Sequence, residues 1–212
     1  MRHTVFLYRL AVFCLVLVLQ VASSVAQDRA ADDVDGAVAF IEKLAEDTKT
    51  VWSDATLTET ERQQGFRDLF NTATDVNYLA RAMIGRHYRT ASTAQRQAYL
   101  AAMEDFIIGE FDTRMTQIGF RDLIVTGTVP APGKRGHLFV RTKVESDTGD
   151  PLLADWRVRK KDGTFQIVNL EVEGINLVIT NREVFSARIS EVGMDGLITE
   201  LREKYPPTQS AD

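Results

Sequence analysis

The chain has 212 residues and a formal net charge of -5, from 30 acidic and 25 basic side chains, and 44% of its residues are hydrophobic. The acidic balance argues against nucleic acid as a partner. This length suits a single domain with one sizeable core. The single cysteine excludes an internal disulfide, so the stability of the fold must come from the burial of apolar surface.

The N-terminus has the features of a secretory signal peptide. Arg2 and Arg9 make a basic start, residues 10–19 form an uninterrupted apolar run, and residues 24–26 provide the small side chains that signal peptidase requires. The run is about half as long as a bilayer-spanning helix, so a retained membrane anchor is the less favoured interpretation. Cys14 lies inside the run, and the mature chain therefore has no thiol chemistry.

Four helices are predicted in the first half of the mature chain. Thr58 and Glu61 have the spacing of a capping box, which starts the second helix. Asp75 is the expected N-cap of a short third helix that ends near Gly85. The first helix, between residues 35 and 52, has an apolar stripe with three- and four-residue steps that consists of Val38, Ile41, Leu44, Ala45, Thr48, Val51 and Trp52.

The fourth helix leads into a sheet. Ser92 with Gln95 has the spacing of a capping box, and Gly119 is the expected end of the helix. After Gly119 the apolar period changes from about 3.6 to 2, which marks the change from helix to strand. Alternating stretches separated by turn residues predict an antiparallel meander with one solvated face, whose other face the helices must cover. The four strands are expected at residues 122–129, 138–145, 152–159 and 165–172.

Two further helices are predicted at the C-terminus. Thr180 with Glu183 repeats the capping-box spacing and is expected to start the first of them. Gly193 should end this helix, and Asp195 should cap a last helix that stops at Pro206.

The predicted fold class is therefore α+β. N-terminal helices precede a four-stranded antiparallel meander that is covered on one face by helices, and two C-terminal helices follow. No internal repeat and no long linker divides the chain. We expect a signal peptide at residues 1–26, a single domain at residues 27–205 and a flexible tail at residues 206–212.

Few residues point to metal binding or catalysis. His87 and His137 lie far apart and have no neighbouring pattern of further ligands, so no metal and no catalytic histidine is predicted. Asp155, Glu171 and Glu173 lie on neighbouring strands, and two carboxylates at such a separation can carry out glycosidase chemistry. The alternative interpretation is that they face water as ordinary cross-strand partners of basic residues, namely Arg157, Arg159 and Lys161.

Four arginines gather near the third and fourth helices. Arg81, Arg86, Arg89 and Arg96 could form an anion site at one end of these helices. A solvated basic edge explains them equally well, and both interpretations stay open.

The order and spacing of several motifs resemble a known family. Residues 84–92 read Ile-Gly-Arg-His-Tyr-Arg-Thr-Ala-Ser, followed by Gln95-Arg96 and Tyr99. Together with the second half of the chain, this pattern is similar to the MlaC family, also called the toluene-tolerance family, over about residues 34–203. The second half contributes Trp156, Gly163, Phe165, Ile167, Val168, Val172, Glu173, Gly174, Asn181, Arg182, Phe185, Gly193, Asp195, Gly196, Leu197, Ile198 and Leu201.

The chain also departs from the family pattern. Phe165 stands where the family often has Trp or Tyr, Asn169 where it often has Asp, and Asn176 where it often has Ser. These departures bear on the roles of individual polar side chains and leave the overall resemblance intact.

The resemblance implies a soluble periplasmic carrier that is not an enzyme and has no cofactor, with bound phospholipid as its cargo. Its implied partners are an inner-membrane ABC transporter complex with its substrate-binding subunit and an outer-membrane lipoprotein complex, which together maintain the lipid asymmetry of the outer membrane. A related branch of the family accompanies hopanoid synthesis, and the sequence does not separate the two branches.

A carrier of this kind needs an apolar cleft between the sheet and its helical cover. A diacyl lipid hides about 30 methylenes, at about 0.8 kcal/mol each, so spontaneous release into water would be very slow and a partner must assist unloading. Periodicity alone favours a filled core over a cleft, and the resemblance reverses this preference. The lipid-contact candidates are Met83, Ile84, Met103, Phe106, Phe111, Leu123, Val125, Val140, Trp156, Val158, Val168, Leu170 and Val172.

Two rival functions remain from other classes. One is an envelope hydrolase that uses Asp155 or Glu173 with water, and the other is a purely structural adaptor.

Overall fold

The computed structural model describes residues 31–133, 136–147 and 149–206. The predicted signal peptide and most of the predicted tail lie outside these residues. A helix at residues 31–53 precedes α2 (Glu59–Ala73), α3 (Val76–Ile84), α4 (His87–Thr90) and α5 (Thr93–Ile118). The strands are β1 (Phe120–Pro130), β2 (His137–Ser146), β3 (Leu152–Lys161), β4 (Thr164–Val172) and β5 (Ile175–Asn176), and α6 (Leu177–Lys204) follows them.

The predicted helix starts at Thr58 and Ser92 are confirmed. The Thr58 hydroxyl accepts the Glu61 N–H at 3.3 Å, and the Glu61 carboxylate accepts the Thr58 N–H at 2.8 Å. The same reciprocal pair joins Ser92 to Gln95 at the start of α5. Each box satisfies backbone donors that have no partner within the first helical turn, which is why a purely local pattern predicts these boundaries.

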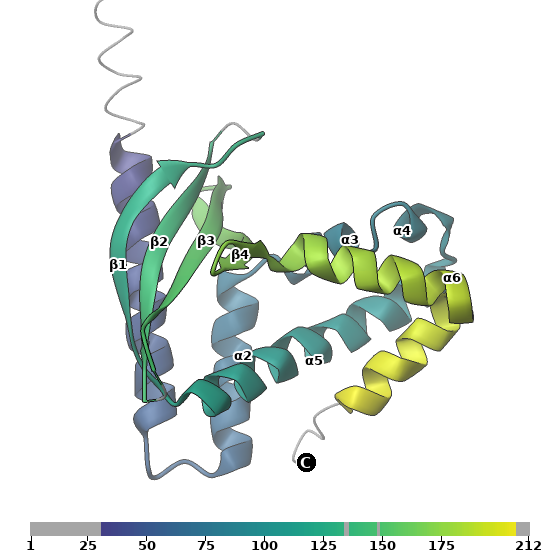
Figure 1. Ribbon diagram of the computed structural model, residues 1–212, viewed down its shortest axis with the longest axis horizontal. Helices are drawn as coiled ribbons and strands as arrows, with labels where there is room; N and C mark the ends of the chain where they lie inside the picture. Colours follow the sequence, from purple (N-terminus) through teal and green to yellow (C-terminus); the bar gives the residue numbers. More distant parts are fainter. Residues whose placement is uncertain (1–30, 134–135, 148, 207–212) are drawn as a thin grey trace, which may run out of the picture.

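The start of α6 differs from the prediction. Its N-cap is Asn176, whose side-chain oxygen accepts the Ile179 N–H at 3.0 Å, so Thr180 lies inside the helix rather than at its start. The amide of Asn176 also donates to Glu171 at 2.8 Å across the β4–β5 hairpin. The hairpin therefore places an effective capping residue ahead of the Thr180 box. Gly193, with φ 75° and ψ 178°, interrupts α6 as expected, and two helical segments meet there at the kink that Figure 1 shows.

The sheet is the predicted antiparallel meander, with one short additional strand. The five strands lie in the order β1-β2-β3-β4-β5. The sequence predicts four strands because β5 has only two residues, too few to show alternation. A bulge shifts the register between β3 and β4, where Val158 pairs with Ile167 and Arg157 with Asn169, so that Val168 is the extra residue.

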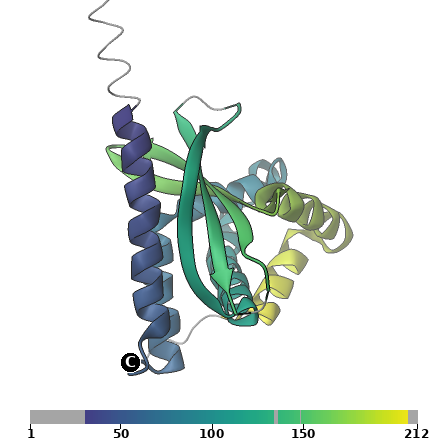
Figure 2. The ribbon, with the colours of Figure 1, turned by 60° about the vertical axis from the view of Figure 1, so that its left-hand side comes forward.

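Buried side chains form two hydrophobic cores. Figures 1 and 2 show the arrangement of the elements that contribute to them, with the helix at residues 31–53 beside the sheet and α5 and α6 to one side of it. The sheet core joins the helix at residues 31–53 to β1–β4 and includes Ile41, Val140 and Trp156. The helical core joins α3, α5 and α6 and includes Tyr99 and Leu197. Helices α2, α3 and α6 all contact β4, which makes this strand the seam between the two cores.

Tyr99 anchors the helical core. Its hydroxyl donates to the Ala80 carbonyl at 2.9 Å, and burial raises the pKa of its phenol, so this donor stays protonated. Within residues 31–133, 136–147 and 149–206, no helix combines the length and the apolar character that crossing a bilayer requires.

Candidate functional site: an apolar cavity between the sheet and the helices

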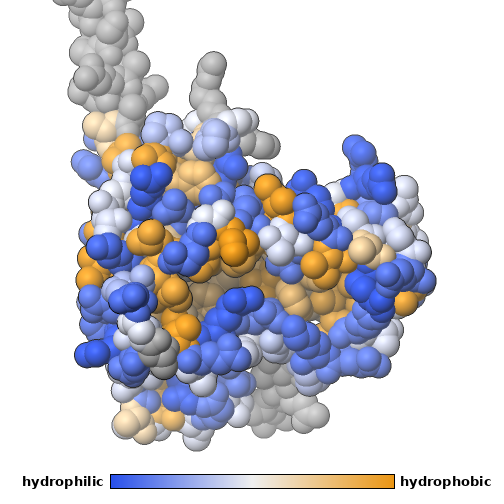
Figure 3. Space-filling view, in the orientation of Figure 1, coloured by the Kyte–Doolittle hydropathy of each residue, from blue (hydrophilic) through white to orange (hydrophobic). Residues whose placement is uncertain are grey.

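An apolar cavity lies where the two cores meet. Its volume is about 320 Å³, which falls within the range of small-molecule binding sites. Residues from the helix at 31–53, from α2, α3, α5 and α6, and from β1–β4 line it. Figure 3 shows the surface hollowed near the centre of this view, with hydrophobic side chains gathered around the hollow.

About half of the predicted lipid-contact residues lie in the wall of this cavity. Those that line it are Met83, Phe106, Phe111, Leu123, Trp156, Leu170 and Val172. Those that do not line it are Ile84, Met103, Val125, Val140, Val158 and Val168.

The second group is placed elsewhere by packing. Ile84 and Met103 are fully buried in the helical core, and Val140 and Val158 are fully buried in the sheet core. Val125 is half-buried against the sheet core, and Val168 is the buried extra residue of the bulge.

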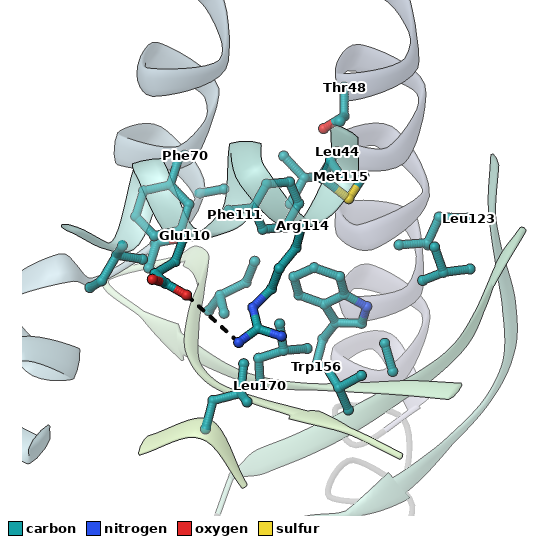
Figure 4. A pocket seen from close by; sticks show the side chains of 18 of the residues that line it. Leu44, Thr48, Phe70, Glu110, Phe111, Arg114, Met115, Leu123, Trp156 and Leu170 are labelled. Atoms are coloured by element: carbon teal, nitrogen blue, oxygen red, sulfur yellow. Dashed lines mark ion pairs between the residues drawn. The ribbon is translucent and has the colours of Figure 1, made fainter. Parts of the chain in front are cut away.

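One wall of the cavity has no counterpart among the predicted contact residues. The helix at residues 31–53 supplies Ile41, Leu44, Ala45 and Thr48, and Figure 4 shows Leu44 and Thr48 beside the pocket. The apolar stripe in the sequence contains all four residues. The signal was therefore present, but a stripe does not say whether it faces a filled core or a cavity.

Hydrogen bonds fix the indole on the strand side of the cavity. The Nε1–H of Trp156 donates to the Thr142 hydroxyl at 3.0 Å, and this hydroxyl donates to the Ala154 carbonyl at 2.9 Å. Thr142 is 1% exposed, so the chain of hydrogen bonds is closed to water. Trp156 therefore presents a fixed aromatic surface to the cavity.

Aromatic packing holds the opposite wall. Phe111 of α5 stacks on Phe66 of α2 with ring centroids 4.6 Å apart and an interplanar angle of 13°. Phe106 contacts Phe185 of α6 edge-to-face at 5.5 Å. Helix α5 is therefore held to α2 and to α6 by aromatic contacts, and Phe66, Phe106 and Phe111 of these contacts line the cavity.

Two buried polar atoms in the wall have no hydrogen-bond partner among the described residues. They are the Thr74 hydroxyl and the Asn169 side-chain oxygen, on residues that are 4% and 5% exposed. Buried polar groups are normally paired with protein or ordered water. Thr74 and Asn169 line the cavity, but these two atoms are themselves buried.

Charged groups occur at the rim, where Glu110 and Arg114 of α5 line the cavity (Figure 4). Burial alone would raise the pKa of Glu110, but hydrogen bonds from Lys204 and Tyr205, with the charges of Lys204 and Arg114, hold this pKa below its ordinary value. Tyr205 reaches α5 because residue 109 is glycine, where a Cβ atom would lie 2.1 Å from the tyrosine ring. Glu110 is therefore ionised and held by the end of α6.

The acidic residues considered for catalysis lie outside the cavity wall. Asp155 pairs with Arg141 at 3.6 Å, Glu171 accepts from the amide of Asn176, and Glu173 accepts the Leu153 N–H. The predicted pairing with Arg157 and Arg159 is wrong. Arg157 donates to the Pro132 carbonyl in the β1–β2 connection, and Arg159 pairs with Asp75, the N-cap of α3.

The four arginines near α3–α5 lie away from the cavity wall. The guanidinium groups of Arg81 and Arg96 lie over the Tyr88 ring, at 5.1 and 5.4 Å from its centroid, and Arg96 also donates to the Tyr88 carbonyl. Two of the four therefore have a structural role. Among the described residues, no group of three or more His, Cys, Asp or Glu side chains is placed to hold a metal ion.

The chain is similar to known proteins both in sequence and in fold. A model of the MlaC protein family matches residues 41–203. A solved structure of a phospholipid-binding protein from Ralstonia solanacearum, in complex with a phospholipid, is 22% identical in sequence, with a TM-score of 0.64. The match covers 79% of this chain and 95% of that chain, so the likeness extends over the whole fold.

Proposed function

The chain belongs to the MlaC family, as its sequence motifs predict, and from this membership and its cavity we propose that it is a periplasmic carrier of phospholipid. The observation that carries the proposal is the apolar cavity between two separately packed cores. The similar fold of the phospholipid-binding protein from Ralstonia solanacearum supports it.

The chemistry of the wall suits acyl chains. Leucine, methionine and phenylalanine side chains from several elements converge on one space, and methionine adapts to chains of different shape. Each methylene that leaves water contributes about 0.8 kcal/mol, so even one acyl chain supplies a large gross binding term. The same term makes unassisted release slow.

Slow release gives the proposed partners their role. We propose that an outer-membrane lipoprotein complex and an inner-membrane ABC transporter complex, with its substrate-binding subunit, load and unload the carrier. The signal peptide expected at residues 1–26 would deliver it to the periplasm between them. In this scheme the protein is not an enzyme, and its lipid leaves chemically unchanged.

Native mass spectrometry of protein purified without detergent tests the proposal. We expect the mass of the protein plus one or more intact phospholipids. Leu170→Glu places a carboxylate in the cavity wall and should abolish lipid copurification, because burial of an unpaired charge beside apolar chains is costly.

Leu153→Glu is the matched control, because Leu153 is 51% exposed and does not line the cavity. It should retain wild-type lipid content. Protein that is empty in every preparation, or equal loss in both variants, would contradict the proposal. Release of fatty acid or lysophospholipid from added lipid would favour the hydrolase instead.

A further inference from the structure

Arg114 is a cation at the mouth of a largely apolar cavity. It lines the cavity, yet 65% of its side chain is exposed, so its guanidinium lies at the boundary between the cavity and water. Figure 4 shows the side chain extending from α5 toward the strands that carry Trp156 and Leu170. An arginine in this position covers apolar surface with its stem and presents its charged end at the opening.

The hydrogen-bonding capacity of Arg114 is largely unused. Its one ion-pair partner among the described residues is Glu110, with 3.6 Å between the arginine Nη2 and the carboxylate Oε2, which is too long for a hydrogen bond. Glu110 is instead held by Lys204 and Tyr205, both of which donate to its Oε1. Two cations, Arg114 and Lys204, therefore share the single carboxylate of Glu110, and this group of three side chains has a surplus of positive charge.

From this geometry we propose that Arg114 binds the phosphate of the lipid head group. The inference rests on the proposed function and adds to it a chemical basis for selecting phospholipid over neutral lipid. A guanidinium presents a planar fork of N–H donors that matches phosphate oxygens in two-point contact. With the phosphate at Arg114, the acyl chains point into the cavity and the rest of the head group faces water.

The test compares two lipids with the same chains. Delipidated protein is incubated with phosphatidylglycerol vesicles that contain a minor fraction of dioleoylglycerol, which lacks the phosphate, and the lipids bound to re-isolated protein are quantified by mass spectrometry. The readout is the ratio of phospholipid to diacylglycerol relative to the vesicle. Because both lipids compete for the same folded molecules, a partly unfolded variant does not bias this ratio.

We expect the wild type to enrich phosphatidylglycerol about five-fold, the size of effect typical of a partly exposed charge pair, and Arg114→Gln to reduce the enrichment to near parity. Arg121→Gln is the matched control. The Arg121 side chain is also 65% exposed and pairs weakly with Asp147 at 3.5 Å, but Arg121 does not line the cavity. This variant should keep the wild-type ratio.

Four outcomes would overturn the inference. Arg114→Gln could retain the wild-type ratio, or Arg121→Gln could lose enrichment to the same extent, which would assign the effect to overall charge. Uptake of neither lipid by the wild type would remove the proposed function and the inference together, whereas equal uptake of both would remove the inference alone. Inorganic phosphate, compared with chloride at equal ionic strength, should lower the ratio if Arg114 also binds free phosphate and leave it unchanged if only the head group binds; either result is consistent with a phosphate contact at Arg114.

Discussion

Replacement of Ala154 by phenylalanine tests whether the space beside the sheet is a cavity. Ala154 is 3% exposed and lines the cavity from β3. A phenyl ring that enters open space gains about 2 kcal/mol from burial, which the loss of side-chain rotation partly offsets. In a filled core the same ring would cost about 1–3 kcal/mol or more through overpacking. The sign and size of the change in the free energy of unfolding therefore distinguish a cavity from a filled core.

Ala80→Phe is the matched control. Ala80 is also buried, at 0% exposure, but it lies in the helical core and does not line the cavity. Since 1 kcal/mol corresponds to about 2–4 °C for a domain of this size, Ala154→Phe should change the melting temperature of delipidated protein by less than about 3 °C. Ala80→Phe should lower it by about 5–10 °C.

The lipid readout completes the experiment. Ala154→Phe should also lose copurified lipid and the rise in melting temperature that lipid gives the wild type, because bound ligand stabilises only the state that binds it. The reasoning fails if Ala154→Phe melts as early as Ala80→Phe, since the space beside Ala154 would then be filled. It fails equally if the variant is stable but still carries lipid.

Two further predictions concern hydrogen bonds next to the cavity. Thr142→Val should lower the free energy of unfolding by about 1–3 kcal/mol in denaturant titrations, because it leaves the buried indole N–H of Trp156 unpaired, whereas Thr142→Ser should cost about 1 kcal/mol. Glu110 should stabilise the fold at neutral pH, because its pKa is lowered in the folded state. The difference in the free energy of unfolding between wild type and Glu110→Gln should be constant well above pH 4.5, which is the ordinary pKa of glutamate. This difference should disappear as the pH falls below that value. A gap that persists in acid would show that the hydrogen bonds from Lys204 and Tyr205 do not depend on the charge.

Local patterns in the sequence predict helix starts only where nothing nearby competes. The boxes at Thr58 and Ser92 follow loops and define their helices as expected. The same spacing at Thr180 fails because Asn176, which the β4–β5 hairpin fixes, caps α6 first. The hairpin depends on a two-residue strand that no alternation could reveal, so this boundary is decided by tertiary structure.

The cavity was predictable in kind but only partly in its residues. Alternation correctly assigns Trp156, Leu170 and Val172 to the buried face of the sheet, because side-chain direction follows from strand geometry. It cannot distinguish them from Val140 and Val158, which lie under the same helices in close-packed regions. That difference depends on the separation between layers, which is set by contacts between distant segments.

The spacing of apolar residues in the sequence could not predict which polar residues lie at the rim of the cavity. Arg114 and Glu110 belong to the helix that the Ser92–Gln95 spacing predicts, and this spacing does not indicate where the charged side chains of the helix lie. Their position at a cavity mouth follows from the way α6 folds back after Gly193 and brings Lys204 and Tyr205 against α5. Only the folded chain brings Lys204 and Tyr205 into contact with Glu110.

The division into two cores bears directly on how a carrier releases its cargo. The sheet core and the helical core each bury their own set of side chains, and the cavity takes its walls from the edges of both, including Met83 of one and Trp156 of the other. A lipid held inside a single continuous core would leave only if that core unpacked, at a cost comparable to unfolding. Under the proposed function, a small separation along β4 would open the cavity while the interior contacts of each core persist. The proposed unloading partner would therefore have to overcome the attraction between the two cores along β4 and not the stability of the whole domain.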